Sequence, residues 1–173
     1  MRQQVERIKS QVDMAINEGG AKLTYGNLKY QMKDPELVNG NFFDAMLLEG
    51  MDPNSEAYKE EFFGPVFNLF KVDSHKDAIE LANKSEYGLA STVFTDDTVK
   101  AEFASRELRA GTVFINDMMA VSSEYPGGGI KGSGYGRESY SDGLYDMSNR
   151  KTIIKMKQDE WKNWKSQQKL NWI

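Results

Sequence analysis

The side chains that carry covalent chemistry in enzymes are scarce in this sequence of 173 residues. It contains no cysteine, which excludes thiol nucleophiles, disulfides and thiolate metal sites. Its one histidine, His75, stands beside Ser74, Lys76 and Asp77 at a predicted helix start. A solvated surface role is favoured there over a place in a Ser-His-Asp triad. We therefore predict neither catalytic residues nor a metal site in this chain.

Glycines are concentrated between residues 127 and 136, which read G-G-G-I-K-G-S-G-Y-G. Such loops can cradle phosphates, but a dinucleotide-binding loop follows directly after a strand and opens a helix. The preceding predicted strand, 112–115, ends well before this loop. A packed turn is favoured, because glycine permits close backbone approach and positive φ. We expect Asn116 to hold backbone in this loop, and Arg137 and Glu138 to form a structural charge pair.

The composition is that of a globular protein with an acidic balance. Charged residues make up 28% of the chain, the net charge is −4 and the pI is about 5.2, which argues against a nucleic-acid partner. No apolar run approaches the ~20 residues that span a bilayer. The first residues lack the apolar segment of a signal peptide. We therefore expect no membrane association and a cytoplasmic location.

Helical and extended patterns alternate along the chain, which predicts an α/β fold with a mainly parallel sheet. In the helix 74–85 we expect a Ser74–Asp77 cap and an inner face of Ala78, Leu81 and Ala82. The other helices are predicted at 1–18, 97–108 and 139–147, the last with a Ser139–Asp142 cap. Strands are predicted at 21–25, 66–72, 91–94, 112–115 and 152–156, with a further apolar stretch at 41–48 and loops at 52–58 and 116–136.

The chain opens on an amphipathic helix, whose apolar residues Val5, Ile8 and Val12 recur at helical spacing. Such a face needs a sheet or another helix to cover it. No strand precedes it in the sequence. We therefore expect the chain to be part of something larger.

An ordered series of motifs resembles the aldehyde dehydrogenase family. Residues 59–66 read K-E-E-F-F-G-P-V and match the family pattern K-E-E-x-F-G-P-V, and residues 126–138 resemble its pattern P-F-G-G-x-K-x-S-G-x-G-R-E. Other stretches follow the family in order and spacing over about residues 2–157; these are 18–22, 78–83, 87–89, 93–95 and 110–116. The bacterial succinate-semialdehyde dehydrogenases look most similar in style.

The resemblance implies a division of the chain and two cofactor contacts. Residues 1–147 correspond to the later part of the catalytic domain, 148–157 to a strand of the oligomerisation domain and 158–173 to a helical tail. Glu61 matches the family glutamate that accepts hydrogen bonds from the nicotinamide ribose hydroxyls. Phe63 matches the phenylalanine that walls the nicotinamide ring. Without the motif, both would be read as a helix-end glutamate and a core phenylalanine.

The resemblance also implies what this chain lacks. The family's cysteine nucleophile, glutamate base, oxyanion asparagine and Rossmann domain all lie before the matching segment. We therefore expect an NAD- or NADP-dependent aldehyde-oxidising enzyme when complete, but neither activity nor bound cofactor for the isolated chain. Gly127 replaces a family aromatic residue, which predicts a wider or poorly ordered aldehyde pocket. The carboxylate-binding serine of succinate-semialdehyde-type members falls near Val121, and Ser122 and Ser123 are close but not aligned.

Two classes of function remain open. The chain is either part of an aldehyde-oxidising enzyme, with a homo-oligomer or a complementing N-terminal part as its partner, or a non-catalytic assembly or binding protein derived from that family. In either case strand 152–156 can extend a neighbouring subunit's sheet. The tail carries all three tryptophans, Trp161, Trp164 and Trp172, and either covers a partner or an exposed inner face, or forms a helix packed on its own chain.

Overall fold

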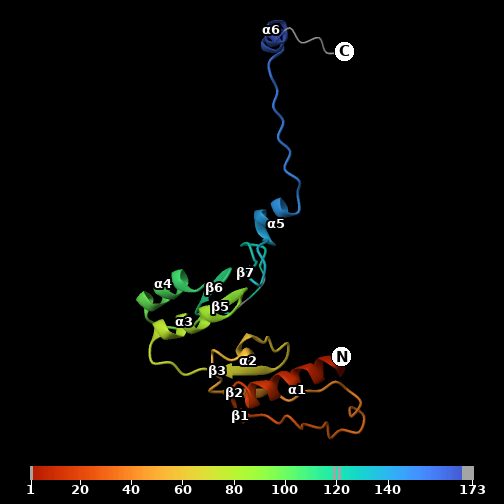
Figure 1. Cartoon of the computed structure of the whole chain (residues 1–173), viewed down its shortest axis with the longest axis vertical. Helices are drawn as coiled ribbons and strands as arrows, with labels where there is room; N and C mark the ends of the chain where they lie inside the picture. The colour runs from red at the N-terminus through yellow and green to blue at the C-terminus, as the bar shows by residue number, and fades with distance from the viewer. Residues whose placement is uncertain (1, 119, 121, 169–173) are drawn as a thin grey trace.

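The computed structural model describes residues 2–118, 120 and 122–168 (Figure 1). An N-terminal lobe, residues 2–70, is followed by a central lobe, residues 74–133, and by a C-terminal arm, residues 148–168. The fold is α/β, as predicted. Among the described residues the strands form three small sheets, of three, two and two strands. Two of the four strand pairs are parallel and two are antiparallel.

In the N-terminal lobe one helix covers a three-stranded sheet. Helix α1 (Arg2–Asn17) confirms the predicted first helix, and the order of the sheet is β1 (Lys22–Tyr25), β2 (Met46–Glu49), β3 (Val66–Leu69). β1 pairs antiparallel with β2, and β2 pairs parallel with β3. The apolar face of α1 is buried against this sheet, and its burial stabilises the core of the lobe. The core residues are Ile8, Val12, Ala15, Ala21, Met46, Leu48, Met51 and Ala57.

Three boundaries in this lobe differ from the prediction. The apolar stretch 41–48 is a strand only from Met46 onward, and β3 ends at Leu69 instead of residue 72. The stretch 52–58, predicted as a loop, contains the one-turn helix α2 (Glu56–Lys59). Tertiary pairing sets the strand boundaries, because β2 extends only as far as its partners β1 and β3.

The central lobe places helices beside a parallel strand pair. Helix α3 (His75–Lys84) leads through β4 (Tyr87–Gly88) to β5 (Ala90–Val93), and α4 (Thr98–Glu107) then connects β5 to its parallel partner β6 (Thr112–Ile115). His75 is exposed, and its ring meets the Phe103 ring of α4 edge-on at 5.5 Å.

The predicted start of α3 is confirmed, whereas its predicted inner face is largely wrong. The Ser74 hydroxyl accepts from the Asp77 N–H at 3.2 Å and donates to the Asp77 carboxylate at 2.7 Å. Ile79 is the buried residue of the helix, and Leu81 is half-buried. Ala78 and Ala82 are exposed, because the helix turns its Ile79 side inward.

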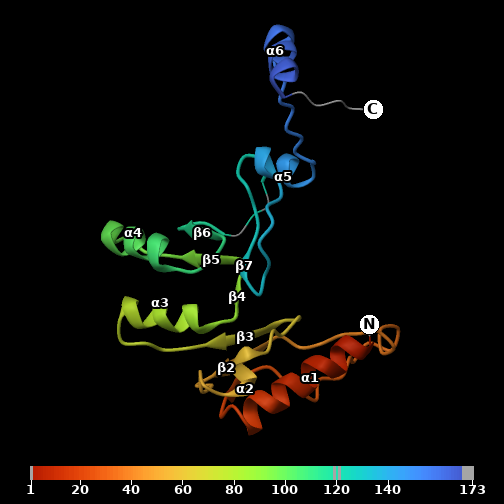
Figure 2. The same cartoon turned by 45° about the horizontal axis from the view of Figure 1, so that its top comes forward.

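The two lobes are joined by the linker that follows β3 and by a tyrosine. The Tyr58 hydroxyl donates to the Leu81 carbonyl at 2.8 Å, and the Tyr58 ring meets that of Phe70 edge-on at 5.6 Å. This contact ties α2 to α3 across the boundary between the lobes. Figure 2 shows the chain running from the end of β3 to α3.

The C-terminal arm leaves both lobes. After α5 (Tyr140–Asp146) the chain runs extended to α6 (Gln158–Gln168), which stands far from the rest of the molecule (Figure 1). Residues 151–157 form no ladder with any other described residue, so the strand predicted at 152–156 is not formed in this part of the structure. Its pairing with another chain stays a prediction. Helix α6 does not pack on its own chain over the described residues, and Trp172 lies outside them. The predicted Ser139 cap is wrong: Ser139 has φ 63° and makes no side-chain cap bond.

Candidate functional site

The segment that contains Glu61 and Phe63 is a short connection held between α2 and β3. The N–H of Glu60 donates to the Ala57 carbonyl and ends α2. A tight turn follows, in which the Gly64 N–H donates to the Phe62 carbonyl at 2.7 Å. The Pro65 carbonyl then accepts from the Met46 N–H at 2.9 Å, which starts the pairing of β3 with β2. Both ends of the segment are therefore fixed by backbone bonds.

Side chains of helix α1 contact the same segment between α2 and β3. The Gln4 side chain donates to the Phe63 carbonyl at 3.0 Å. The Gln11 side chain donates to the Glu61 carbonyl at 3.2 Å and to the Glu60 carboxylate at 2.6 Å. The Gly64 backbone lies directly on the Ile8 side chain, with room for little more than hydrogen between them. The helix that opens the chain thus positions the residues of the K-E-E-F-F-G-P-V motif.

Both residues predicted from the motif line one cavity of about 470 Å³ at the boundary between the lobes. Glu61 is exposed, and Phe63 keeps 70% of its surface accessible. The structure therefore brings together a carboxylate and a flat apolar ring. Their assignment as cofactor contacts stays a prediction. The rest of the lining comes from the central lobe: Ala82, Asn83, Ser85, Tyr87, Gly88, Leu89, Ala90, Ser91, Arg109 and Ser133.

Three residues of this region were not found from the sequence. Asn83 accepts from the Arg109 N–H at 2.7 Å and donates to the Glu107 carbonyl at 2.8 Å, so it joins α3 to the end of α4. Arg109 brings a positive charge to the same cavity as Glu61. Gln11 lies on the apolar face of α1, where a polar residue interrupts the periodicity. The motif match at 78–83 includes Asn83, but order and spacing carry no information about its long-range hydrogen bonds.

The glycine-rich loop is a packed structural turn, as predicted. The Lys131 ammonium donates to the carbonyls of Asn83 and Ser85, at 3.1 and 3.0 Å, and so ties the loop to the end of α3. The Ser133 hydroxyl accepts from the Gly88 N–H at 3.0 Å. Strand β7 (Ile130–Lys131) pairs antiparallel with β4. The donors and acceptors of this loop thus serve its own packing against the central lobe.

Asn116 and Arg137 make other contacts than those predicted from the sequence. Asn116 holds backbone, but that of Thr95 in the turn before α4, which it bonds through both its amide groups at 2.8 and 2.9 Å. Arg137 forms no charge pair with Glu138 among the described residues. Its guanidinium donates to the Gly129 carbonyl at 2.9 Å, because the loop folds its carbonyls toward that side chain.

A smaller cavity of about 90 Å³ lies beside Gly127, where the sequence predicts a wider or poorly ordered pocket. Its walls include Phe114 and Tyr125, whose rings meet edge-on at 6.4 Å, and the Glu138 side chain. Ser122 also lines it, whereas Val121 lies outside the described residues. A side chain at Gly127 would meet little, since an added Cβ touches just Glu138 at 3.8 Å.

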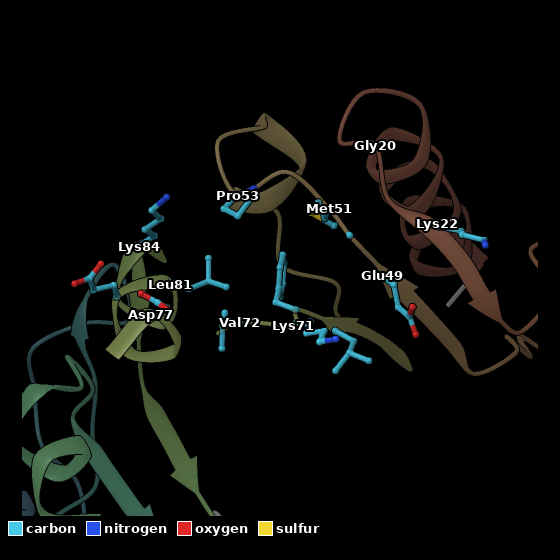
Figure 3. Close-up of a pocket in the computed structure, with 14 residues that line it drawn as sticks. Gly20, Lys22, Glu49, Met51, Pro53, Lys71, Val72, Asp77, Leu81 and Lys84 are labelled. Carbon is cyan, nitrogen blue, oxygen red and sulfur yellow. The ribbon is translucent and has the colours of Figure 1, made fainter. Parts of the chain in front are cut away.

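A larger cavity lies elsewhere and contains neither Glu61 nor Phe63. It has a volume of about 840 Å³ and separates the N-terminal lobe from α3. Figure 3 shows Asp77, Leu81 and Lys84 of α3 facing Met51 and Pro53 across it. Its charged groups are lysines and carboxylates at the surface, so both signs of charge are present. It therefore contributes no side chain to the candidate site.

The described residues contain no group of three or more histidine, aspartate or glutamate side chains arranged to hold a metal ion. None of their helices is both long enough and apolar enough to cross a membrane.

Comparisons with known proteins agree with the motif series. Residues 1–153 match the aldehyde dehydrogenase family model. An aldehyde dehydrogenase of Paenarthrobacter nicotinovorans is 44% identical over 114 residues, which are 66% of this chain and 25% of the relative. Betaine aldehyde dehydrogenase of Bacillus subtilis (strain 168) is 36% identical over 158 residues, which are 91% of this chain and 32% of the relative.

Solved structures give the same result. The betaine aldehyde dehydrogenase of Staphylococcus aureus in complex with NAD⁺ superimposes with a TM-score of 0.77 at 36% identity, over 84% of this chain and 28% of that one. The chain therefore spans about a quarter to a third of the length of these relatives. The matched family model, the sequence identities and the superposition together show that this chain belongs to the aldehyde dehydrogenase family.

Proposed function

We propose that this chain supplies one wall of the nicotinamide–ribose site of an NAD- or NADP-dependent enzyme that oxidises aldehydes to carboxylic acids. The observation that carries the proposal is the placement of Glu61 and Phe63 on one cavity, on a segment held by α1. A solved relative was crystallised in complex with NAD⁺, which supports a dinucleotide as the cofactor.

The Glu61 and Phe63 side chains of the cavity fit such a cofactor. The Glu61 carboxylate can accept from two ribose hydroxyls at once, and the Phe63 ring offers a flat apolar surface to a nicotinamide ring. When bound, the cofactor would accept hydride. The work of these two side chains is to orient it and to keep water from one of its faces.

The complete reaction needs groups that this sequence does not contain. Covalent oxidation of an aldehyde in the family uses a thiolate, and this chain has no cysteine. We propose that the isolated chain has no dehydrogenase activity and binds no cofactor. Activity would then require a complementing N-terminal part, and a homo-oligomer is the other partner that we propose. We further propose a cytoplasmic location, with neither nucleic acid nor membrane as a partner.

Reconstitution tests the proposal. The N-terminal part of the Bacillus subtilis relative, truncated where its match to this chain begins, would be mixed with the full chain, NAD⁺ or NADP⁺ and an aldehyde. Formation of the reduced nicotinamide is followed by absorbance. We expect turnover from the mixture alone, and none from either component by itself.

Matched variants identify the site. Glu61→Gln and Phe63→Ala should raise the KM for the cofactor in the mixture, because each removes a contact to it. Glu36→Gln, an exposed carboxylate in the loop between β1 and β2, serves as the control. Turnover by the pure chain would contradict the proposal. So would a reconstituted activity that neither Glu61 nor Phe63 affects.

The substrate class can be tested in the same mixture. We propose a succinate-semialdehyde-type aldehyde from the style of the motifs, although the serine that would bind its carboxylate is not aligned. A second candidate is a trimethylammonium aldehyde, such as betaine aldehyde. The pairing of Phe114 with Tyr125 beside the Glu138 carboxylate would suit a cation, and the Bacillus subtilis relative is named for that substrate. The ratio of kcat/KM for the two aldehydes decides between them.

A non-catalytic assembly role is the alternative. The observation that favours it is the C-terminal arm, because α6 lies beyond the matched residues 1–153 and stands free of both lobes. If no N-terminal part restores activity but the chain still binds its own copies, this alternative replaces the enzymatic proposal.

A further inference from the structure

Gln11 is a buried polar side chain in the otherwise apolar face of α1. It is 6% exposed and lies one helical turn from Ile8 and from Ala15. Its amide nitrogen donates to the Glu60 carboxylate at 2.6 Å and to the Glu61 carbonyl at 3.2 Å. Both neighbours are acceptors, so the orientation of the amide is determined by its partners.

The same side chain carries an unpartnered atom. Within the described residues, the Gln11 Oε1 is the buried side-chain oxygen that finds no hydrogen-bond partner. Buried polar atoms are nearly always bonded, and one that is not destabilises the fold. Methionine has a similar shape and carries no such oxygen. The choice of glutamine here is therefore poorly explained by stability.

The position of Gln11 explains it better. Residues 4, 8 and 11 lie on one face of the helix. Gln4 bonds the Phe63 carbonyl, Ile8 supports Gly64, and Gln11 bonds the Glu61 carbonyl. Since the main chain of the segment is held against α1, the exposed side chains of Glu61 and Phe63 are left to line the cavity.

We propose that Gln11 is a positioning residue for Glu61 and Phe63, the two residues that form the proposed wall of the cofactor site. Its amide N–H groups fix the Glu61 main chain and thereby the direction of the Glu61 carboxylate and the Phe63 ring. It does so at some cost to the stability of the chain. The link to the cofactor rests on the proposed function, whereas the link to the main chain does not.

The main-chain link is tested on the full chain by NMR relaxation and urea unfolding. Gln11→Met removes the donors and keeps the shape, Gln11→Lys keeps donors without the oxygen, and Gln3→Leu changes an exposed glutamine of the same helix. In Gln11→Met we expect the order parameters of residues 61–63 to fall from about 0.85 to about 0.6 or lower, with an unchanged or higher urea midpoint. Gln11→Lys and Gln3→Leu should keep the order of the wild type.

The cofactor link is tested in the reconstituted mixture. We expect Gln11→Met to raise the KM for the cofactor by about tenfold, with a smaller change in kcat, because misplacement weakens binding. If Glu61→Gln raises that KM while Gln11→Met does not, this inference fails and the proposed function stands. If neither variant changes it, the proposed function fails as well. The inference is overturned if residues 61–63 stay ordered in Gln11→Met, or if that variant has a lower urea midpoint than the wild type. It is also overturned if residues 61–63 lose order in Gln11→Lys.

Discussion

Gly111 faces the main chain of the glycine-rich loop so closely that no side chain fits between them. A Cβ there would overlap the Gly128 carbonyl and lie 3.1 Å from the Gly129 Cα. Both obstacles are backbone, so they cannot move aside as a flexible side chain would. The glycine is therefore required by the contact between the start of β6 and the loop.

We expect Gly111→Ala to destabilise the chain by about 1–3 kcal/mol, the usual cost of overpacking a closed contact. Gly127→Ala is the matched control, because an added Cβ there meets only a side-chain atom at 3.8 Å. Urea unfolding measures both variants. Equal midpoints for the two would contradict the close contact.

At the scale of residues, the sequence motifs drew attention to Glu61 and Phe63, which line one cavity, but not to Gln11. The periodicity of the first helix selects apolar residues, and it correctly identified Ile8 and Val12 as buried. A glutamine on that face reads as an interruption. Only the position of its acceptors, 49 and 50 residues further along the chain, gives it a role.

At the scale of elements, Tyr58 connects α2 with α3 through its hydroxyl. Burial raises the pKa of the Tyr58 phenol above its ordinary value of 10.0. The neutral phenol is therefore favoured in the folded state. Its contribution to stability is complete below pH 10.0 and is lost as the pH rises through the raised pKa.

We expect the free energy of unfolding of the wild type to fall with rising pH in this alkaline range more steeply than that of Tyr58→Phe. The variant cannot ionise at this position and lacks the bond to the Leu81 carbonyl. Urea titrations at a series of pH values measure the difference. Tyr25→Phe, at an exposed tyrosine, is the matched control. A Tyr58→Phe profile parallel to the wild type would contradict the expectation.

The elements also show where a local pattern suffices. The same Ser-x-x-Asp pattern starts α3 and α5, and it forms a cap only at Ser74. A capping residue needs an extended backbone. Ser139 instead has φ 63°, because the chain enters α5 directly from the bridge between Gly127 and Glu138. A long-range contact therefore overrides the pattern, and no local sequence could reveal it.

At the scale of the whole molecule, the C-terminal arm exposes apolar side chains that a partner could cover. Ile153 is 67% exposed and Ile154 is 90% exposed, on a segment that forms no ladder within the part of the chain that the structure describes. The sequence predicted a strand here, and a strand requires a neighbour to complete its hydrogen bonds. Residues 2–118, 120 and 122–168 of the single chain do not supply that neighbour.

We expect the chain to self-associate, and Ile154→Lys to shift it toward the monomer. A charge at this position would disfavour pairing with a second copy. Light scattering over a range of concentrations measures the masses. Met147→Lys is the control, since Met147 is 87% exposed but precedes the segment. A wild type that stays monomeric at all concentrations would contradict the prediction.

The isolation of α6 has a practical consequence for spectroscopy. All three tryptophans of the sequence lie beyond residue 160, and Trp161 and Trp164 are stacked at 5.2 Å on this helix. The fluorescence emission of the indole rings will therefore report on the tail, and it will change little when the two lobes unfold. Conversely, any quenching or blue shift of that emission on mixing would signal directly that the tail has found a surface to cover.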